Sequence, residues 1–524
     1  MTNLEEYQDL ASCPEPVQPP KGRFIINLMA NVANFIVSVI IGLWFTPYLI
    51  HHLGVAAYGL IPLAMTVTSY LQLLTIALNG AVGRYLTIAM ERKDIEDANR
   101  IFNTSLVGSI LIILVVLGPM FWLSMHAYWF FNVPPGYEQQ FSWLFLCTVG
   151  MFLPTTLSSA FSLSSFCRNR FDILNTVNIV SNLTRVLAVV ILFRIFAPQV
   201  WHVGAGMVMA GVIGIIGSVL IWRYLTPMLH IRPRLFSIKT LQQLVGTGGW
   251  FFVNQIGTIL FLSIDIVVVN KLVGTEAGGH YGAIMQWSSL LRGIGGVVAG
   301  VFGPTIIAFY AHQDIAGLVK YSRQAVKYQG LVIALPVGII CGLSAPLLRV
   351  WLGPDFVSLA PLMSLMTFHL CVNIGVLPLF NIQVATNNVR IPGIVTCVMG
   401  AMNLGLALLL AGPVGWGMYG VATAGAIMLT AKNLLFTPWY GARILGIGYG
   451  SFFRETIPII GATLGLAGIG LLLSHIFSIH NWTGLIIAGA ILTTMYVLVT
   501  YLVLLSKEER LMAIKMIFSK KVSA

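Results

Sequence analysis

The chain has 524 residues, of which 57% are hydrophobic and 9% are charged. Soluble proteins carry about a quarter charged residues, so this composition excludes a soluble enzyme, an extracellular disulfide scaffold and a nucleic-acid-binding protein. It is the composition of an integral membrane protein. Six cysteines without any C-x-x-C pair are expected to be buried apolar residues rather than a metal or redox site.

The order of apolar and polar segments predicts an all-α polytopic membrane protein. Residues 1–23 are polar and rich in proline and contain no apolar segment typical of a signal peptide, so we expect a disordered cytoplasmic tail there. A membrane span needs about 20 apolar residues. Fourteen segments meet this requirement, near 24–49, 58–80, 101–125, 141–166, 172–196, 203–224, 246–270, 279–308, 326–348, 359–384, 391–411, 416–438, 455–476 and 484–505.

The placement of Lys and Arg supports the count of fourteen spans. With these spans, 24 of the 29 basic residues fall on one side of the membrane, and Lys432 is among them. Only Arg194, Lys271 and Arg349 fall on the other side, while Arg185 and Arg292 lie inside spans. Because basic residues concentrate in cytoplasmic loops, both termini are predicted to be cytoplasmic, the last 19 residues, 506–524, forming a basic tail.

The two halves of the chain resemble each other. Asn34 followed by Leu53-Gly54 and Tyr58-Gly59 corresponds to Asn254 followed by Val273-Gly274 and Tyr281-Gly282. Each repeat holds six spans, an even number, so the repeats are expected to be parallel, as in transporters that bind substrate at the repeat interface. The predicted division is an N-terminal six-helix lobe at 24–230, a C-terminal six-helix lobe at 231–445 and two additional helices at 446–505.

With these features the chain resembles the polysaccharide and oligosaccharide flippases of the multidrug/oligosaccharidyl-lipid/polysaccharide exporter superfamily. The residues that carry the resemblance are spread over both halves: Leu53-Gly54 to Tyr58-Gly59-Leu60, Asn79-Gly80 with Arg84-Tyr85, Asp265, Gly274, Tyr281, and Trp351-Leu352-Gly353-Pro354-Asp355-Phe356. The resemblance covers roughly residues 24–505 and implies transport of a lipid-linked glycan across the bacterial inner membrane by alternating access between two lobes.

Two other functions remain as alternatives. Drug/cation antiporters of the same superfamily share the topology but usually carry a carboxylate in the N-terminal lobe, where spans 1 to 6 hold only Asp172. A membrane-embedded glycan-modifying enzyme would be expected to place catalytic groups in a large outer loop. The outer loops here are short and offer only Glu138, Glu276 and Asp355 as acids.

Charged residues inside spans are the leading candidates for binding substrate, because burying one at the bilayer centre costs at least about 2.5 kcal/mol. Arg292 lies near the middle of span 8, just before Gly293, Gly295, Gly296 and Gly300. We expect it to face a cavity between the lobes and bind a diphosphate or an acidic sugar; alternatively it pairs within the bundle. Arg185 in span 5 is expected to line the same cavity, unless Asn182 and Thr184 satisfy it between helices.

Other polar residues complete the candidate site. Asp265 in span 7 is a candidate for ion coupling or gating, or it caps Lys271. Arg84, at the cytoplasmic end of span 2, either receives a phosphate or anchors the span on the positive side of the membrane. Asn34, Asn254 and Gln255 would hydrogen-bond sugar hydroxyls in a cavity or join helices outside one. No pattern of catalytic residues, metal ligands or cofactor-binding residues is present, so no cofactor is expected.

The sequence thus predicts a flippase for a polyprenyl-diphosphate-linked oligosaccharide in the bacterial inner membrane, acting by physical translocation. Its expected partners are the lipid-linked oligosaccharide, membrane lipid, and a polysaccharide polymerase or glycosyltransferases.

Overall fold

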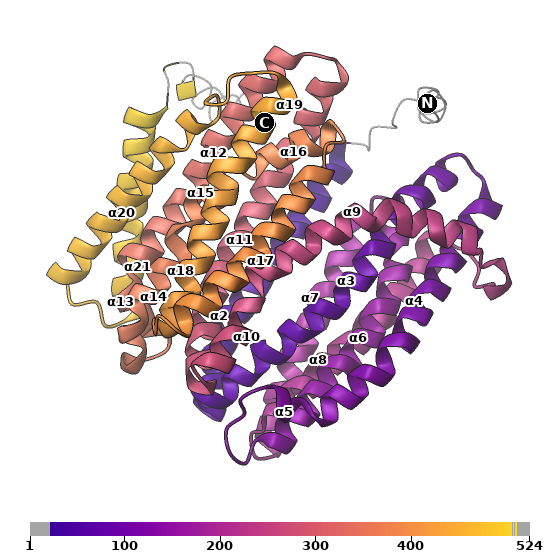
Figure 1. Ribbon diagram of the computed structural model, residues 1–524, viewed down its shortest axis with the longest axis horizontal. Helices are drawn as coiled ribbons and strands as arrows, with labels where there is room; N and C mark the ends of the chain where they lie inside the picture. Colours follow the sequence, from indigo (N-terminus) through magenta and orange to yellow (C-terminus); the bar gives the residue numbers. More distant parts are fainter. Residues whose placement is uncertain (1–20, 506, 508, 511–524) are drawn as a thin grey trace.

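The computed structural model describes residues 21–505, 507, 509 and 510, and this part of the chain is helical without strands. Fourteen of its helical segments are long and apolar enough to cross a membrane, which confirms the predicted number of spans. The predicted tails at 1–23 and 506–524 lie almost entirely outside the described residues. The face where α2 begins and η5 ends is called the terminal face below, and the other the opposite face (Figure 1).

The first six spans form the N-lobe, in which α6 packs against α8, and α8 against α7. Its helices are α2 (Lys21–Leu53), α3 (Val55–Glu91), α4 (Ile95–Met125), α5 (Ala127–Phe130), α6 (Glu138–Cys167), α7 (Phe171–Ile195) and α8 (Val200–Leu225). The helix α6 is continuous despite Pro154.

The C-lobe contains more interrupted helices than the sequence predicted. After η1 (Pro233–Leu235) come α9 (Ile238–Leu262), α10 (Ile264–Leu272), α11 (Thr275–Ala311), α12 (Ile315–Gly342), α13 (Ser344–Trp351), η2 (Pro354–Leu359), α14 (Ala360–Phe368), α15 (Leu370–Gly375), α16 (Pro378–Ala385), α17 (Arg390–Ala411), α18 (Gly417–Thr430), η3 (Ala431–Phe436) and α19 (Thr437–Leu445). The seventh span breaks at Ser263, and the span predicted at 359–384 is divided into three helices.

The last two spans pack on the outside of the C-lobe. They follow η4 (Phe453–Glu455) and consist of α20 (Ile457–Ile476) and of α21 (Trp482–Val499) with η5 (Thr500–Leu504). Helix α20 lies along α12, where Gly342 and Gly470 bring the two backbones into contact, and α21 lies against α20 at the edge of the molecule (Figure 1). Neither helix contributes a residue to the cavity between the lobes described below. The lobe boundaries near 230 and 445 remain predictions.

The repeat is visible in the backbone of the turns. Gly54 and Gly274 precede α3 and α11 with φ values of 83° and 122°, and Lys93 and Gln313 both have positive φ, at 60° and 56°. The next residues, Asp94 and Asp314, each cap a helix by accepting a backbone N–H three residues later. The second residue of each pair follows the first by 220 positions (274 − 54, 313 − 93 and 314 − 94). The two lobes therefore share turn geometry in detail.

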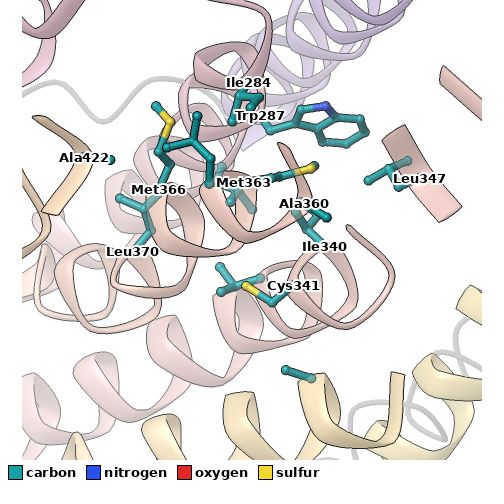
Figure 2. Packing of buried hydrophobic residues seen from close by; sticks show 14 of the residues in the cluster. Ile284, Trp287, Ile340, Cys341, Leu347, Ala360, Met363, Met366, Leu370 and Ala422 are labelled. Atoms are coloured by element: carbon teal, nitrogen blue, oxygen red, sulfur yellow. The ribbon is translucent and has the colours of Figure 1, made fainter. Parts of the chain in front are cut away.

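The C-lobe has the larger apolar core. Trp287 and Ile284 of α11 pack with Met363 and Met366 of α14 and with Cys341 of α12 (Figure 2). This core fixes α11, the helix that carries Arg292, against the rest of the C-lobe. Among the described cysteines, Cys341 and Cys371 are buried as expected, whereas Cys147, Cys167 and Cys397 are only partly buried.

Candidate functional site

A cavity of about 490 Å³ lies between the two lobes. Its charged lining residues are Arg185 from α7 of the N-lobe and Arg292 from α11 of the C-lobe, as expected from the sequence. The other polar lining groups are hydroxyls and one amide, contributed by Ser38, Thr46, Tyr58, Thr66, Ser69, Ser263, Gln286 and Ser289. Among the described residues that line the cavity none is acidic, so it presents positive charge and hydrogen-bonding groups within an otherwise apolar wall.

Arg292 lies at the middle of its helix, since α11 extends from Thr275 to Ala311. The glycines that follow it allow close helix packing: a Cβ at Gly293 would lie 2.5 Å from the Phe35 ring of α2, and one at Gly295 would overlap Ile374 of α15. The half-buried guanidinium forms no ion pair with any described acid. It is therefore held in place by its helix while its charge stays available to a ligand.

A second, smaller pocket of about 30 Å³ adjoins the cavity at Arg292 and is also lined by Asp265, Tyr281 and His369. The Tyr281 hydroxyl donates a hydrogen bond to Asp265 Oδ2 at 3.0 Å. The other carboxylate oxygen is buried and has no donor among the described residues. The helix break at Ser263 lies directly before Asp265, and interrupted helices of this kind are typical of ion and substrate sites in transporters.

Arg185 also lacks an acidic partner in the described part of the chain. The Arg185 Nε is buried and donates no hydrogen bond to a described residue, although the side chain lines the cavity. Asn182 and Thr184 are not among its hydrogen-bond partners: the Thr184 hydroxyl donates to the Val180 carbonyl. The structural alternative considered for Arg185 thus receives no support from these neighbours.

The other four predicted binding residues do not reach the cavity between the lobes. The Asn34 side-chain amide donates a hydrogen bond to Asn175 Oδ1 at 3.1 Å and so joins α2 to α7. Polar side chains of neighbouring membrane helices commonly form such hydrogen bonds with each other. Arg84 is exposed near the terminal end of α3. Gln255 is half-buried on α9 outside the cavity, and Asn254 lines a different pocket, near Lys432.

Lys432 is the residue that sequence reasoning placed wrongly. It was counted among the loop residues of the cytoplasmic side, but it lies inside the span Gly417–Leu445 with 7% of its surface exposed. The predicted span at 416–438 already contained this position, so the error was to count a residue six positions inside the expected span end with the cytoplasmic loop. The signal available in the sequence was Lys432 itself, fourteen positions before Gly446, the first helix-ending glycine after it.

The lobes meet tightly on the opposite face. Asn132, which precedes α6, and Asn270 of α10 form a reciprocal pair: the Asn132 N–H donates to Asn270 Oδ1 at 3.0 Å, Asn132 Nδ2 to the Asn270 carbonyl at 2.7 Å, and Asn270 Nδ2 to the Asn132 carbonyl at 3.0 Å. Nearby, a Cβ at Gly59 would lie 2.6 Å from the Gly279 backbone nitrogen, so α3 and α11 are in backbone contact. The cavity is thus sealed from the opposite face.

Comparison with known proteins places this architecture in a family. The family model described as "Polysaccharide biosynthesis protein" matches residues 24–310, which is more than half of the chain. The chain belongs to this family. The membrane protein EpsK of Bacillus subtilis (strain 168), described as uncharacterized, is 35% identical over 493 residues, covering 94% of this chain and 98% of EpsK.

Solved structures share the fold. The lipid II flippase MurJ in an inward closed conformation superposes with a TM-score of 0.64 at 15% identity, covering 91% of this chain and 99% of that one. The MATE multidrug transporter DinF-BH superposes with a TM-score of 0.55 at 17% identity, covering 83% and 97%. The expected resemblance to the exporter superfamily and the all-α fold with two six-helix lobes are therefore confirmed. The protein is a multi-pass membrane protein of the polysaccharide biosynthesis family with a transporter fold.

Proposed function

We propose that this protein is a flippase that moves a polyprenyl-diphosphate-linked oligosaccharide across the bacterial inner membrane for polysaccharide export. The observation that carries this proposal is the cavity between the lobes, lined by Arg185 and Arg292 from different lobes and by no described acid. Two guanidinium groups that form no ion pair with a described acid suit a diphosphate, which accepts several charge-assisted hydrogen bonds at once.

The mechanism that follows needs no bond to break. The diphosphate contacts the two arginines, the hydroxyls of residues such as Ser38 and Ser289 hydrogen-bond the sugars, and the polyprenyl tail remains in the bilayer. The seal at Asn132 and Asn270 then opens while the lobes close on the terminal face. Asp265, joined to Tyr281 beside Arg292, is the proposed ion-coupling or gating carboxylate. A polysaccharide polymerase or glycosyltransferases would supply and consume the lipid-linked glycan.

The proposed orientation puts the terminal face in the cytoplasm, because most Lys and Arg residues lie on that side. We expect a cysteine introduced at His52 or Asn481 to react with a membrane-impermeant thiol reagent added to intact cells. A cysteine at Asp94, or at Ser519 in the tail beyond the described residues, should react only after permeabilisation. The parental protein, with its native cysteines, is the control. The reverse labelling pattern would contradict the orientation.

The direct test of function is reconstitution. Purified protein in proteoliposomes is expected to move a fluorescent polyprenyl-diphosphate oligosaccharide between leaflets. The measurement is the fraction of the fluorescence that a membrane-impermeant quencher added outside can reach. Protein-free liposomes and heat-inactivated protein are the controls. Uptake of cationic dyes without movement of the lipid-linked glycan would instead support an antiporter. The acids on the described N-lobe helices lie at helix ends rather than in mid-span, which argues against that alternative: Glu91 ends α3, and Glu96, Asp97, Glu138 and Asp172 lie in the first turns of their helices.

A further inference from the structure

A second polar pocket, of about 240 Å³, lies inside the C-lobe between α9, α16, α17 and the π-helical turn η3. It lies toward the terminal face, since Gln383 is near the end of α16 and Pro392 near the start of α17. Its one charged residue among those that the structure describes is Lys432. No function described so far uses this lysine.

The Lys432 ammonium has fewer partners than a buried charge requires. It donates to Asn433 Oδ1 at 3.2 Å, and its Nζ lies 4.8 Å from the centre of the Phe380 ring. It forms no ion pair with a described acid, and the described residues that line the pocket include no Asp or Glu. A lysine inside a membrane span normally pairs with a counter-charge or marks a path for substrate or ions.

A second group of the pocket independently lacks a partner. Gln383 is 4% exposed, and its Nε2 is a buried donor with no acceptor among the described residues. The hydroxyls of Thr258 and Thr396 line the same pocket and donate to the Asn254 and Pro392 carbonyls, but neither accepts a hydrogen bond from Gln383 Nε2. The pocket therefore holds two buried donors: Gln383 Nε2 has no acceptor among the described residues, and the Lys432 ammonium, which has three N–H bonds, donates to Asn433 Oδ1 and has no counter-charge.

Two features of the backbone suit a binding site. A π-helical turn, Ala431–Phe436, carries Lys432, and such turns are frequent at functional sites because the widened turn redirects side chains. Exposed Asn254 and Val384, the latter with 53% of its surface accessible, lie at the edge of the pocket and open it to the outside of the C-lobe.

The pocket also lies on the same helix faces as the pocket of Arg292. In span 7, Thr258 of α9 lines the Lys432 pocket and Asp265 of α10 lines the Arg292 pocket. In span 12, Lys432 of η3 lines the Lys432 pocket and Gly425 of α18 lines the Arg292 pocket. Each pair is separated by seven residues, or about 10 Å along a helix. The Lys432 pocket thus lies nearer the terminal face than the Arg292 pocket does.

We propose that the Lys432 pocket binds the phosphate group of a membrane lipid, and, resting on the proposed function, that this lipid is the polyprenyl diphosphate before it reaches Arg292. An ammonium and an amide N–H₂ supply the donors that phosphate oxygens accept. Phosphates are the anions that membrane lipids bring to this depth. The described lining contains no acid, and the positive charge of Lys432 disfavours competing cations.

Binding is tested with purified full-length protein and three probes: farnesyl diphosphate, a short-chain phosphatidylglycerol and inorganic pyrophosphate. Affinities are measured by calorimetry for the wild type and for Lys432→Met, which keeps the length of the side chain but removes its charge. We expect Lys432→Met to weaken the binding of farnesyl diphosphate and of pyrophosphate about tenfold or more, because both present phosphate oxygens to the ammonium, and we expect the wild type to bind pyrophosphate more weakly because it lacks the lipid chain. Exposed Lys320→Met is the matched control and should bind as the wild type does.

A second variant separates binding from folding. Gln383→Glu keeps the side-chain volume and gives Lys432 an internal carboxylate, so this protein should be at least as thermostable as the wild type and should still lose phosphate binding. If the two variants lost binding of phosphatidylglycerol but kept binding of farnesyl diphosphate, the pocket would be a phosphate site for bulk membrane lipid. That result would overturn the proposal that the polyprenyl diphosphate binds there before it reaches Arg292. Unchanged binding of all three probes by both variants would overturn the site itself, whether or not the protein flips glycans.

Discussion

Replacement of Arg292 by alanine is expected to stop movement of the lipid-linked glycan while the protein still folds and inserts. The guanidinium lines the cavity between the lobes and has no ion-pair partner among the described acids, so its removal leaves no buried carboxylate that depended on it for an ion pair. A hydrogen bond to a charged group contributes about 1.5–3 kcal/mol. Loss of that amount corresponds to a reduction in transport of about 10- to 150-fold. The measurement is the initial flipping rate in proteoliposomes at equal protein content.

Two further variants interpret this result. Arg292→Lys keeps the charge but not the two-pronged geometry and should retain part of the activity. Arg194→Ala removes an exposed arginine at the far end of α7 and should flip at the wild-type rate. If Arg292→Ala instead reduced the amount of folded protein, Arg292 would have a structural role. A well-folded Arg292→Ala protein with full activity would contradict both roles.

Cross-linking Asn132→Cys to Asn270→Cys is expected to abolish nearly all transport, and cleavage of the cross-link should restore it. These residues join the lobes by reciprocal hydrogen bonds on the opposite face, and the cavity cannot release a glycan there while they remain joined. The measurement is flipping before and after treatment with a short, reducible thiol cross-linker, in protein whose six native cysteines are replaced.

The control for this experiment is a cysteine pair within one lobe, Asn132→Cys with Glu138→Cys, treated in the same way. It should flip normally, because this cross-link does not hold the lobes together. The single variants with one cysteine each report any effect of substitution alone. Full transport with the lobes cross-linked at Asn132 and Asn270 would show that the seal does not open during transport.

Much of the fold could be predicted because hydrophobicity and charge act over whole spans. The number of spans follows from apolar length, and the parallel repeat from landmarks such as Gly54 and Gly274, which need positive φ before a helix. The helix breaks were harder to predict. The break at Ser263 involves no proline, and the turn at 431–436 depends on local hydrogen bonding that no spacing of residues reveals.

The candidate site was only partly predictable for a related reason. A charge in mid-span is informative by itself, so Arg185 and Arg292 could be selected, and the structure brings both to one cavity. Amides are informative only with their neighbours. Asn34 contacts Asn175, which is 141 residues away, and that contact cannot be seen in one sequence. Lys432 was missed because it lies near the end of its predicted span, at 416–438, and a basic residue there is hard to tell from a residue of the cytoplasmic loop.

The backbone contact of α3 with α11 has a consequence for the origin of the protein. Gly59 of α3 lies against Thr275 and Gly279 of α11, and Gly279 lies against Val55 of α3. Val55 and Thr275 are 220 positions apart, as are Gly59 and Gly279, so each half makes the same contact with the other. A self-complementary contact of this kind is what two identical subunits make about a twofold axis. An ancestor of half this length could therefore have worked as a homodimer. The same offset pairs Asp265 with Phe45 and Arg292 with Gln72, so only one copy of the duplicated scaffold acquired these charges. Duplication would then have freed the two halves to differ where the ligand binds while the axis between them stayed fixed.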